Sequence, residues 1–554
     1  MSRRRKALMI FGATAVPCLL AVVSGSTASA AQQSASSSVH YAAITGSGST
    51  WAQNAVDQWI ANINNFQVTF TGDGSAAGRT DFALGTFDFA ISDIGYQGFD
   101  PVTDTDDVSH RAYAYLPVTA GGTSFPYNIS VSGKRITNLR LSGKTLAEIF
   151  TKHITNWDDP AITADNNGRK LPSMPITTVV ESEGSGTSYQ FSRYLNDLFP
   201  SYWVPFDGGH SGATEYWPQA SGIGQVAQSS SAQVMNYISS APGSIGYDEY
   251  SYALQAGYPV IGLENQAGYY VLPSEYNDAV ALTKAIINTN KSSSDYLLEN
   301  LNNVYTNPDP RAYPLSSYSY SIIPTSPSDE LMAKSGSPAF PAKAQSLAAF
   351  LDYSICQGQE YIGPIGYSAL PVNLVEAGFQ QIEKIKAAAP QVSLAALNIS
   401  TCHNPTFDRK NLNENYLALV APAPPSCDKS GQGPCTGILN ANANGGKGSS
   451  TKSGSGSTPS ASASASASAS SSASSSTSSS TGGATDTSGT TGPTSTGGTT
   501  PDGTASNVAA ELPPGQDNGL NDWALGALVV LLLLAILIIP PIVSRGMSGR
   551  GRQW

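Results

Sequence analysis

The sequence predicts an α/β fold built on a largely parallel sheet, within a chain that also carries non-globular segments. Two observations define the folded part. Between about Val39 and about Pro405, aromatic residues, β-branched residues and turn signals occur in ordinary globular proportion, enough for two domains of typical size. Within this part, a strand, a Gly/Ser-rich loop and a helix follow one another repeatedly, as in βα units. After it, Ser, Gly, Thr and Ala dominate the sequence.

Residues 1–30 have the pattern of a secretory signal peptide that is cut after Ala30. A basic start from Arg3 to Lys6 precedes an apolar run from Ala7 to Val23 and the small residues Ala28-Ser29-Ala30. A membrane anchor is the alternative, but the run is short and ends in a cleavage pattern. Cys18 lies inside the run without a small-residue lipobox before it, so we expect it to be removed with the signal.

The first βα units are the clearest. Short buried strands are predicted at Val68–Thr71 and Phe87–Ile91, and helices at Thr50–Ile63 and Gly78–Leu84. Ligands bind beyond the carboxyl ends of the strands in such a sheet. The loops that follow the strands are therefore the first place to look for a site.

Three Gly/Ser-rich loops lead into predicted helices and are the candidate binding elements. Glycine lets the backbone approach a ligand closely, Ser and Thr cap the helix, and the free N–H groups of the first turn attract an anion. None of the loops ends in the Gly-Lys-Ser or Gly-Lys-Thr of a nucleotide phosphate loop. Together they predict an oxyanion site. The loops are Gly46–Trp51, Gly72–Gly78 and Glu183–Ser188.

The composition argues against two classes of function. The net charge of -11 gives no basic stripe, so nucleic acid is not an expected partner. Only five histidines occur, and the folded region has no G-x-S-x-G elbow and no metal-ligand cluster, so we expect no catalytic residue, no metal and no cofactor. A phosphatase or another hydrolase is the less favoured alternative.

Four cysteines remain after removal of the signal, which indicates two disulfides in an exported chain. Of the three pairings, we favour Cys427 with Cys435, across a short loop with Pro and Gly, and Cys356 with Cys402. A zinc site is the alternative, but C-x-x-C spacings are absent and only His403 lies near a cysteine. Residues 406–440 would then form a disulfide-stapled extension.

The C-terminal part predicts a tether and an anchor. Residues 441–520, nearly all small and polar up to Ala510, cannot bury apolar surface and should form a disordered linker. Residues 523–543 carry no charge and are long enough to span a bilayer, and the tail 544–554 is basic, which favours the cytoplasm. A damaged sortase signal at Leu512–Gly515 is the alternative, although its expected Thr is missing.

A series of motifs in the folded part points to one family. The motifs are Ile44–Trp51, Phe70–Ser75, Thr86–Asp93, Gly184–Tyr189, Pro242–Tyr247 and Tyr313–Leu315. The chain resembles, over most of residues 40–400, the periplasmic phosphate-binding proteins of ATP-driven importers, in an actinobacterial-like form with a C-terminal membrane anchor. The resemblance implies a two-lobed fold of type 2 with two crossover strands. Lobe 1 would hold about 40–120 and 255–405, and lobe 2 about 121–254, with the anion in the cleft between them.

The resemblance also implies seven phosphate-binding residues, and it divides them between the lobes so that closure of the cleft assembles the site. As an ionised carboxylate, Asp93 would accept a hydrogen bond from a protonated anion and repel a fully ionised one such as sulfate. The implied contacts are Thr50, the backbone N–H of Trp51, Ser75 and Asp93 on one lobe, and Ser185, Gly186 and Thr187 on the other.

Glu181 departs from the family pattern, which has an arginine four residues before Ser185. The exchange replaces a bidentate cation by an anion. Arg79, at the start of the helix after the second loop, is the candidate to supply the missing charge by pairing with Glu181. The alternative is that Arg79 and Glu181 are ordinary solvated surface residues.

The sequence therefore predicts an exported solute-binding protein that captures inorganic phosphate or a related oxyanion for an ABC permease in the same membrane. It would be a single-pass membrane protein with its binding domain outside the cell and its C-terminal tail in the cytoplasm. A membrane-tethered sensor or surface-binding protein with an altered ligand is the alternative that Glu181 and the long tether support.

Overall fold

The computed structural model describes the part of the chain that the sequence predicts to be folded. Its residues are 39–100, 105–220, 224–336, 339–394, 397–408, 411–412 and 414–435. The predicted signal peptide, linker, sortase-like motif, transmembrane helix and cytoplasmic tail lie outside these residues. Within the described ranges, no helix combines the length and the apolar character that crossing a bilayer requires.

The larger sheet has six strands in the order β13-β6-β18-β3-β1-β2. Its first three strands along the chain are parallel, as predicted, and β18 runs antiparallel to both β3 and β6. The strands are β1 (Ile44–Gly48), β2 (Val68–Gly72), β3 (Phe89–Ser92), β6 (Tyr113–Ser124), β13 (Asp248–Glu249) and β18 (Ser316–Pro324).

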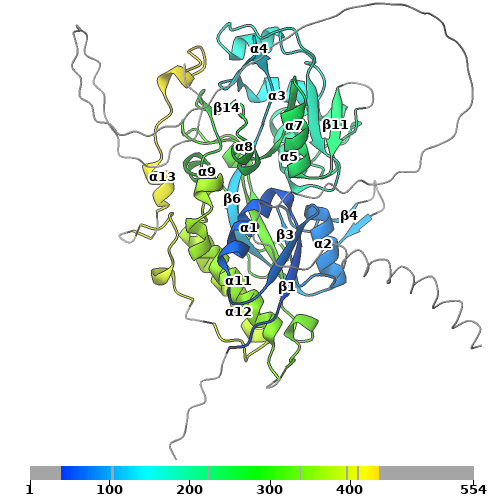
Figure 1. Ribbon diagram of the computed structural model, residues 1–554, viewed down its shortest axis with the longest axis vertical. Coiled ribbons are helices and arrows are strands. Elements are labelled where there is room, and N and C mark those ends of the chain that lie inside the picture. Colours follow the sequence, from blue (N-terminus) through cyan, green and yellow to red (C-terminus); the bar gives the residue numbers. More distant parts are fainter. Residues whose placement is uncertain are drawn as a thin grey trace, which may run out of the picture. The chain divides into compact units, whose positions relative to one another are not determined.

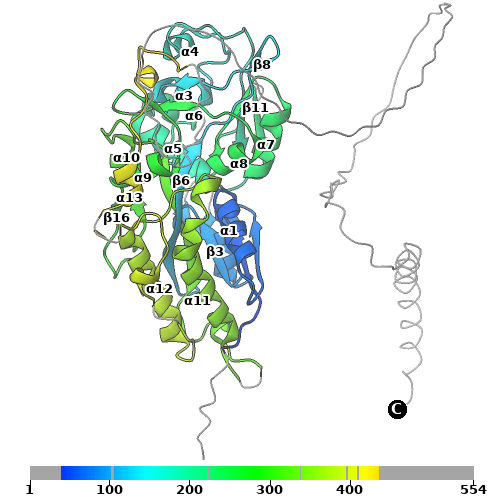
Figure 2. The ribbon, with the colours of Figure 1, turned by 60° about the vertical axis from the view of Figure 1, so that its left-hand side comes forward.

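Four helices accompany this sheet (Figures 1 and 2). They are α1 (Thr50–Asn62), α2 (Ser75–Leu84), α11 (Ala342–Ile355) and α12 (Val372–Ala388). The first agrees with the predicted helix to within one residue. The second begins at Ser75 rather than at the predicted Gly78, because Gly74 takes a positive φ of 99° as the cap and the small residues after it fit the first helical turn.

The second lobe is built on a three-stranded parallel sheet in the order β11-β10-β12. A cluster of aromatic side chains fills its core, in which Phe191 stacks on Trp217 with ring centroids 5.3 Å apart. The elements that concern the site are β10 (Thr177–Glu181), α5 (Gly186–Leu198), β11 (Gln225–Gln228), α7 (Ser231–Ser240), β12 (Ser244–Gly246) and α8 (Tyr250–Ala256).

The long strand β6 connects the lobes. It leaves the larger sheet at Ser124, and Tyr127 then bridges to Ile245 in the second lobe. Further along the chain, β14 (Gly262–Glu264) pairs with β9 (Arg140–Leu141), so the chain still pairs with the second lobe beyond the expected boundary at residue 254. The described residues thus form a two-lobed α/β structure, as predicted.

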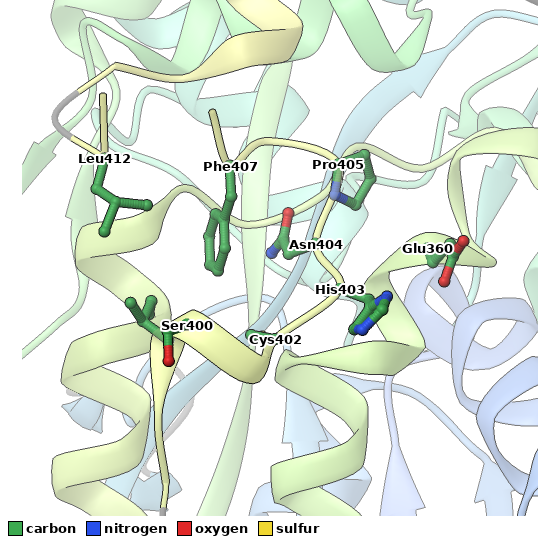
Figure 3. Close-up of a pocket in the computed structure, with 9 residues that line it drawn as sticks. Glu360, Ser400, Cys402, His403, Asn404, Pro405, Phe407 and Leu412 are labelled. Atoms are coloured by element: carbon green, nitrogen blue, oxygen red, sulfur yellow. The ribbon is translucent and has the colours of Figure 1, made fainter. Parts of the chain in front are cut away.

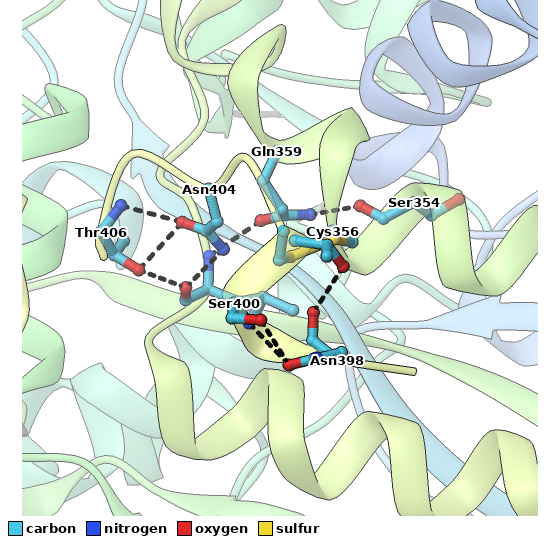
Figure 4. The surroundings of a disulfide bond; sticks show 10 residues. Ser354, Cys356, Gln359, Asn398, Ser400, Asn404 and Thr406 are labelled. Carbon is cyan, nitrogen blue, oxygen red and sulfur yellow. Dashed lines mark hydrogen bonds between the residues drawn. A yellow bond between two sulfur atoms is a disulfide. The ribbon is translucent and has the colours of Figure 1, made fainter. Parts of the chain in front are cut away.

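Both favoured disulfides are confirmed. Cys356, at the end of α11, is bonded to Cys402, and Figure 4 shows the hydrogen bonds around this bridge. The second bridge joins Cys427 and Cys435 in a loop that the buried Arg140 holds by donating to the Cys427 carbonyl oxygen at 3.1 Å. Because all four sulfurs are bonded in pairs, they offer no thiolate to zinc, and the zinc alternative is wrong.

Gly48, at the end of β1, generates a prediction about stability. Its φ is 129°, and a Cβ there would fall against the Ile91 carbonyl oxygen, well inside van der Waals contact. Gly48→Ala should therefore lower the free energy of unfolding by about 3 kcal/mol or more, as overpacking adds to backbone strain.

Urea denaturation followed by circular dichroism would measure this loss. Gly85→Ala is the matched control, because Gly85 also has a positive φ, of 74°, but nothing lies within 4 Å of its added Cβ. It should cost only about 1 kcal/mol. Equal losses for the two variants would contradict the close contact at Gly48.

Candidate functional site

The three Gly/Ser-rich loops all run from a strand into the start of a helix, as predicted. Ser49 caps α1, and its hydroxyl accepts a hydrogen bond from the backbone N–H of Ala52. Ser185 caps α5 in the same way and accepts from the N–H groups of Thr187 and Ser188. Together with the loop before α2, these caps bring the starts of three helices toward one place between the lobes (Figure 1).

Asp93, directly after β3, lies at the centre of this place. Its buried carboxylate accepts hydrogen bonds from the hydroxyls of Ser49 at 2.8 Å, Ser75 at 3.1 Å and Ser319 at 2.7 Å. Burial raises the pKa of Asp93, and the three hydroxyl bonds oppose that rise. The carboxylate thus joins the start of α1, the start of α2 and the strand β18.

The second lobe closes over Asp93. A Cβ added to Gly186 would lie 2.5 Å from the Asp93 carboxylate and 2.7 Å from the Ser75 hydroxyl oxygen, so only glycine fits. The Gln190 side chain donates to the Asp93 carbonyl oxygen at 3.1 Å, and the Ala76 N–H donates to the Gly184 carbonyl oxygen at 3.0 Å. These contacts define a closed arrangement of the two lobes.

Glu181, the last residue of β10, is buried at the same meeting point of the two lobes, called the cleft below, and is not solvated. Its carboxylate accepts from the Ser185 hydroxyl, and the Ser231 hydroxyl lies 3.3 Å from its other oxygen. Ser231 also lies 3.1 Å from the hydroxyl of Thr50 on the other lobe. Burial, followed by the charges of Glu183 and Asp93, raises the pKa of Glu181 to about 8.

The expected pairing of Arg79 with Glu181 is wrong. Arg79 is buried on α2, where its guanidinium pairs with Asp107 at 2.9 Å and with Glu215 at 2.7 Å. Its remaining nitrogen donates to the Ser92 hydroxyl at 3.1 Å. Asp107 belongs to the hairpin β4–β5 (Gly98–Asp100 and Thr105–Asp107), and all three guanidinium nitrogens donate to groups other than Glu181. Within the described residues, no lysine or arginine forms an ion pair with Glu181.

The structure thus brings most of the predicted binding residues together. Thr50, Ser75, Asp93, Ser185 and Gly186 meet in the cleft, and Thr187 follows in the buried first turn of α5. The indole of Trp51 packs in the core against Tyr367, so its backbone in the first turn of α1 is the part near the cleft.

Sequence reasoning missed Ser231 and Ser319 in the cleft and the two acids that hold Arg79. The segment Gln228–Ser231 has the same strand, serine and helix order as the three loops, so it offered a signal. Ser319 stands in an alternating run within β18 and offered none.

A separate hollow lies on the larger lobe beside the first disulfide. It has a volume of about 380 Å³, and Figure 3 shows Glu360 and His403 on one side of it and Phe407 and Leu412 on the other. None of the predicted binding residues lines it.

The sequence matches the family model described as "PBP superfamily domain" over residues 24–357, more than half of the chain. The chain belongs to the PBP superfamily.

Curated relatives agree with the resemblance to periplasmic phosphate-binding proteins that the motifs indicate, and this part of the prediction is confirmed. The membrane-anchored form stays a prediction. The phosphate-binding protein PstS of Methanocaldococcus jannaschii is 29% identical over 356 residues, which cover 62% of this chain and 86% of the relative. Phosphate-binding protein PstS 2 of Mycobacterium tuberculosis is 28% identical over 333 residues, which cover 59% and 82%. These relatives carry the names of binding proteins rather than enzymes.

Solved structures of phosphate-binding proteins are similar to this member of the PBP superfamily. One is a high-affinity periplasmic phosphate-binding protein with bound phosphate, which is 20% identical with a TM-score of 0.46. The match covers 62% of this chain and 93% of that one.

The Arg79 ion pairs generate a prediction about closure of this PBP-superfamily protein. Asp107 lies on the same lobe as Arg79, whereas Glu215 lies on the other lobe, next to the Ser185 loop. Glu215→Gln should therefore weaken the closed arrangement and raise the radius of gyration of the phosphate-free protein.

Small-angle X-ray scattering would measure this change. Asp107→Asn is the matched control, because it removes a charge from the same arginine without breaking an interlobe contact. An equal expansion in both variants, or none in Glu215→Gln, would contradict a role of Glu215 in holding the lobes together.

Proposed function

We propose that this protein captures inorganic phosphate, or a closely related oxyanion, in the cleft between its two lobes. One observation supports this most. Of the residues that the motifs named as anion contacts, Ser75 and Gly186 meet at the buried carboxylate of Asp93. Ser185 contacts the second buried acid, Glu181, and Thr50 reaches Glu181 through Ser231. The names of the curated relatives support the same ligand.

In this proposal the anion is held by N–H groups of the first turns of α1, α2 and α5 and by the hydroxyls of Thr50, Ser75, Ser185 and Thr187. Asp93 accepts a hydrogen bond from a proton on the anion. A carboxylate in this place disfavours sulfate, which carries no proton at neutral pH. The lobes open to admit the ligand and close over it.

The wider organisation is also part of the proposal. The binding domain at 40–405 lies outside the cell, and its lobe 2 extends past the expected boundary at residue 254 to β14. The segment 406–440 forms its stapled extension, and residues 441–520 form the linker. Residues 523–543 span the membrane, with the tail 544–554 in the cytoplasm. An ABC permease in the same membrane accepts the ligand.

Removal of the Ser75 hydroxyl should weaken phosphate binding. Ser75→Ala deletes one hydrogen-bond partner of Asp93 and one donor to the ligand. The binding free energy should fall by about 1 to 2 kcal/mol, which is roughly a tenfold rise in Kd. Isothermal titration calorimetry with phosphate, arsenate and sulfate would measure it.

Ser321→Ala is the control for this titration. Ser321 is an equally buried serine on β18, but its hydroxyl donates to the Ala90 carbonyl oxygen, outside the group around Asp93. Its Kd should be that of the wild-type protein. Absence of phosphate binding by the wild-type protein would refute the proposed function.

The second candidate is a membrane-tethered sensor or surface-binding protein with another ligand, and Glu181 is the observation that favours it. If phosphate is the ligand, Glu181→Arg should leave the affinity unchanged or strengthen it, by at most about 1.5 to 3 kcal/mol for a charge-assisted hydrogen bond. Calorimetry of the two proteins would compare them. If the wild-type protein does not bind phosphate at millimolar concentration but the Glu181→Arg variant does, the result would support a ligand other than phosphate.

A further inference from the structure

Glu181 is a buried acid at the point where both lobes reach the cleft. Its carboxylate contacts Ser185 on its own lobe, and through Ser231 it reaches Thr50 on the other lobe. The residue is wholly inaccessible to solvent. It therefore lies among the groups that the proposed function gives to the anion, not on the rim of the cleft.

The charged and titratable groups that face Glu181 are acids and phenols. They come from its own loop, from the end of β3, from the segment around β13 and from α8. They are Glu183, Asp93, Tyr247, Asp248 and Tyr252. Two basic residues among those described are engaged with other groups. Arg79 is held by its two acids, and Lys152 donates to the Gly224 carbonyl oxygen at 3.0 Å, beside the start of β10.

Fewer hydroxyls reach the Glu181 carboxylate than the three that reach Asp93. Ser185 donates to one oxygen of Glu181, and Ser231 lies 3.3 Å from the other. Ser231 has one proton, and both Thr50 and Glu181 lie within hydrogen-bond distance of its oxygen. The neighbouring Asp248 is also buried, and one of its carboxylate oxygens has no hydrogen-bond partner. A buried carboxylate without a cation and with few donors is strongly disfavoured as an ion.

We propose that Glu181 acts in the closed cleft as a neutral carboxylic acid that donates a hydrogen bond to the bound anion, in the place of a cation. This inference rests on the proposed function and adds a specificity-determining residue to it. An ionised carboxylate can only accept hydrogen bonds and would repel the anion, whereas the protonated acid offers one O–H donor. Binding of the anion is therefore linked to a proton on Glu181.

The direction of the pH effect follows from the free protein. Burial and the neighbouring acids raise the pKa of Glu181 to about 8, and a bound anion stabilises the protonated form further. Below that pH the proton is already present, and Glu181 adds no pH dependence to Kd. Above it, one proton must be taken up with the anion, so Glu181 makes Kd rise about tenfold per pH unit.

The test is the number of protons taken up per phosphate by the full chain. Calorimetry at pH 6 to 9.5, repeated in buffers of different ionisation enthalpy, measures this number. Inorganic phosphate also changes its protonation, so the variant Glu181→Gln, which keeps a neutral donor that cannot titrate, is compared with the wild-type protein. At pH 9 the wild-type protein should take up about one proton more per phosphate than Glu181→Gln, because the variant lacks the carboxyl group that binds this proton. At pH 6 the two Kd values should agree within about threefold.

Two further variants identify the site of the proton. Asp278→Asn removes another fully buried acid, one that accepts from Ser316 outside the cleft, and should leave the wild-type proton count unchanged. Asp248→Asn should also keep the extra proton. If Asp248→Asn loses the extra proton uptake at pH 9 and Glu181→Gln keeps it, the proton is bound by Asp248, and the inference is wrong.

Equal proton counts in the wild-type protein and Glu181→Gln, with phosphate bound by both, would refute this inference and leave the proposed function intact. Absence of any phosphate binding by the wild-type protein would refute both. If Glu181→Gln does not fold, infrared difference spectra of the wild-type protein decide. A protonated carboxylic acid C=O band that shifts when phosphate binds at pH 7 is expected, and its absence would contradict the inference.

Discussion

The buried carboxylate of Asp93 is the constraint on which the arrangement of the cleft depends. It has no ion-pair partner of its own among the described residues, so three serine hydroxyls from β18 and from the starts of α1 and α2 must satisfy it. Those bonds require small residues next to it, and Gly186 of the other lobe fits only because it has no side chain. The position of each helix start is thus tied to one acid at the end of β3.

The partners of Arg79 determine which charges remain in the cleft. The charge of Arg79 lies close enough to Asp93 to lower the pKa of that acid, against the rise that burial causes. The hydrogen bonds of Arg79 to acids, however, go to Asp107 and Glu215. Its charge therefore holds the lobes together rather than compensating Glu181. The cleft is left with acids, hydroxyls and helix starts. An anion that enters must be held by dipoles and donors, and not by a guanidinium.

Local patterns made much of this predictable from the sequence, and long-range contacts made the rest unpredictable. Glycine and serine next to a strand end identified the helix starts, and the short spacing of Cys427 and Cys435 indicated their disulfide, because both features lie within short segments. Cys356 and Cys402 are 46 residues apart, and their pairing followed once the other two cysteines were assigned to each other. Ser319 is 226 residues from the Asp93 that it contacts, and Glu215 is 136 residues from Arg79. The two acids that hold Arg79 come from β5 and from the other lobe, and no local pattern in the sequence reveals either contact.

A simple charge comparison shows why a neutral Glu181 is compatible with anion binding. A helix start carries roughly half a positive charge, so the four helix starts at the cleft, those of α1, α2, α5 and α7, together amount to about two. Ionised Asp93 and ionised Glu181 would cancel that charge completely. With Glu181 protonated, about one positive charge remains, and the acid adds a donor where it would otherwise add an acceptor. The loss of the arginine therefore leaves room for an anion only if the acid in its place keeps its proton.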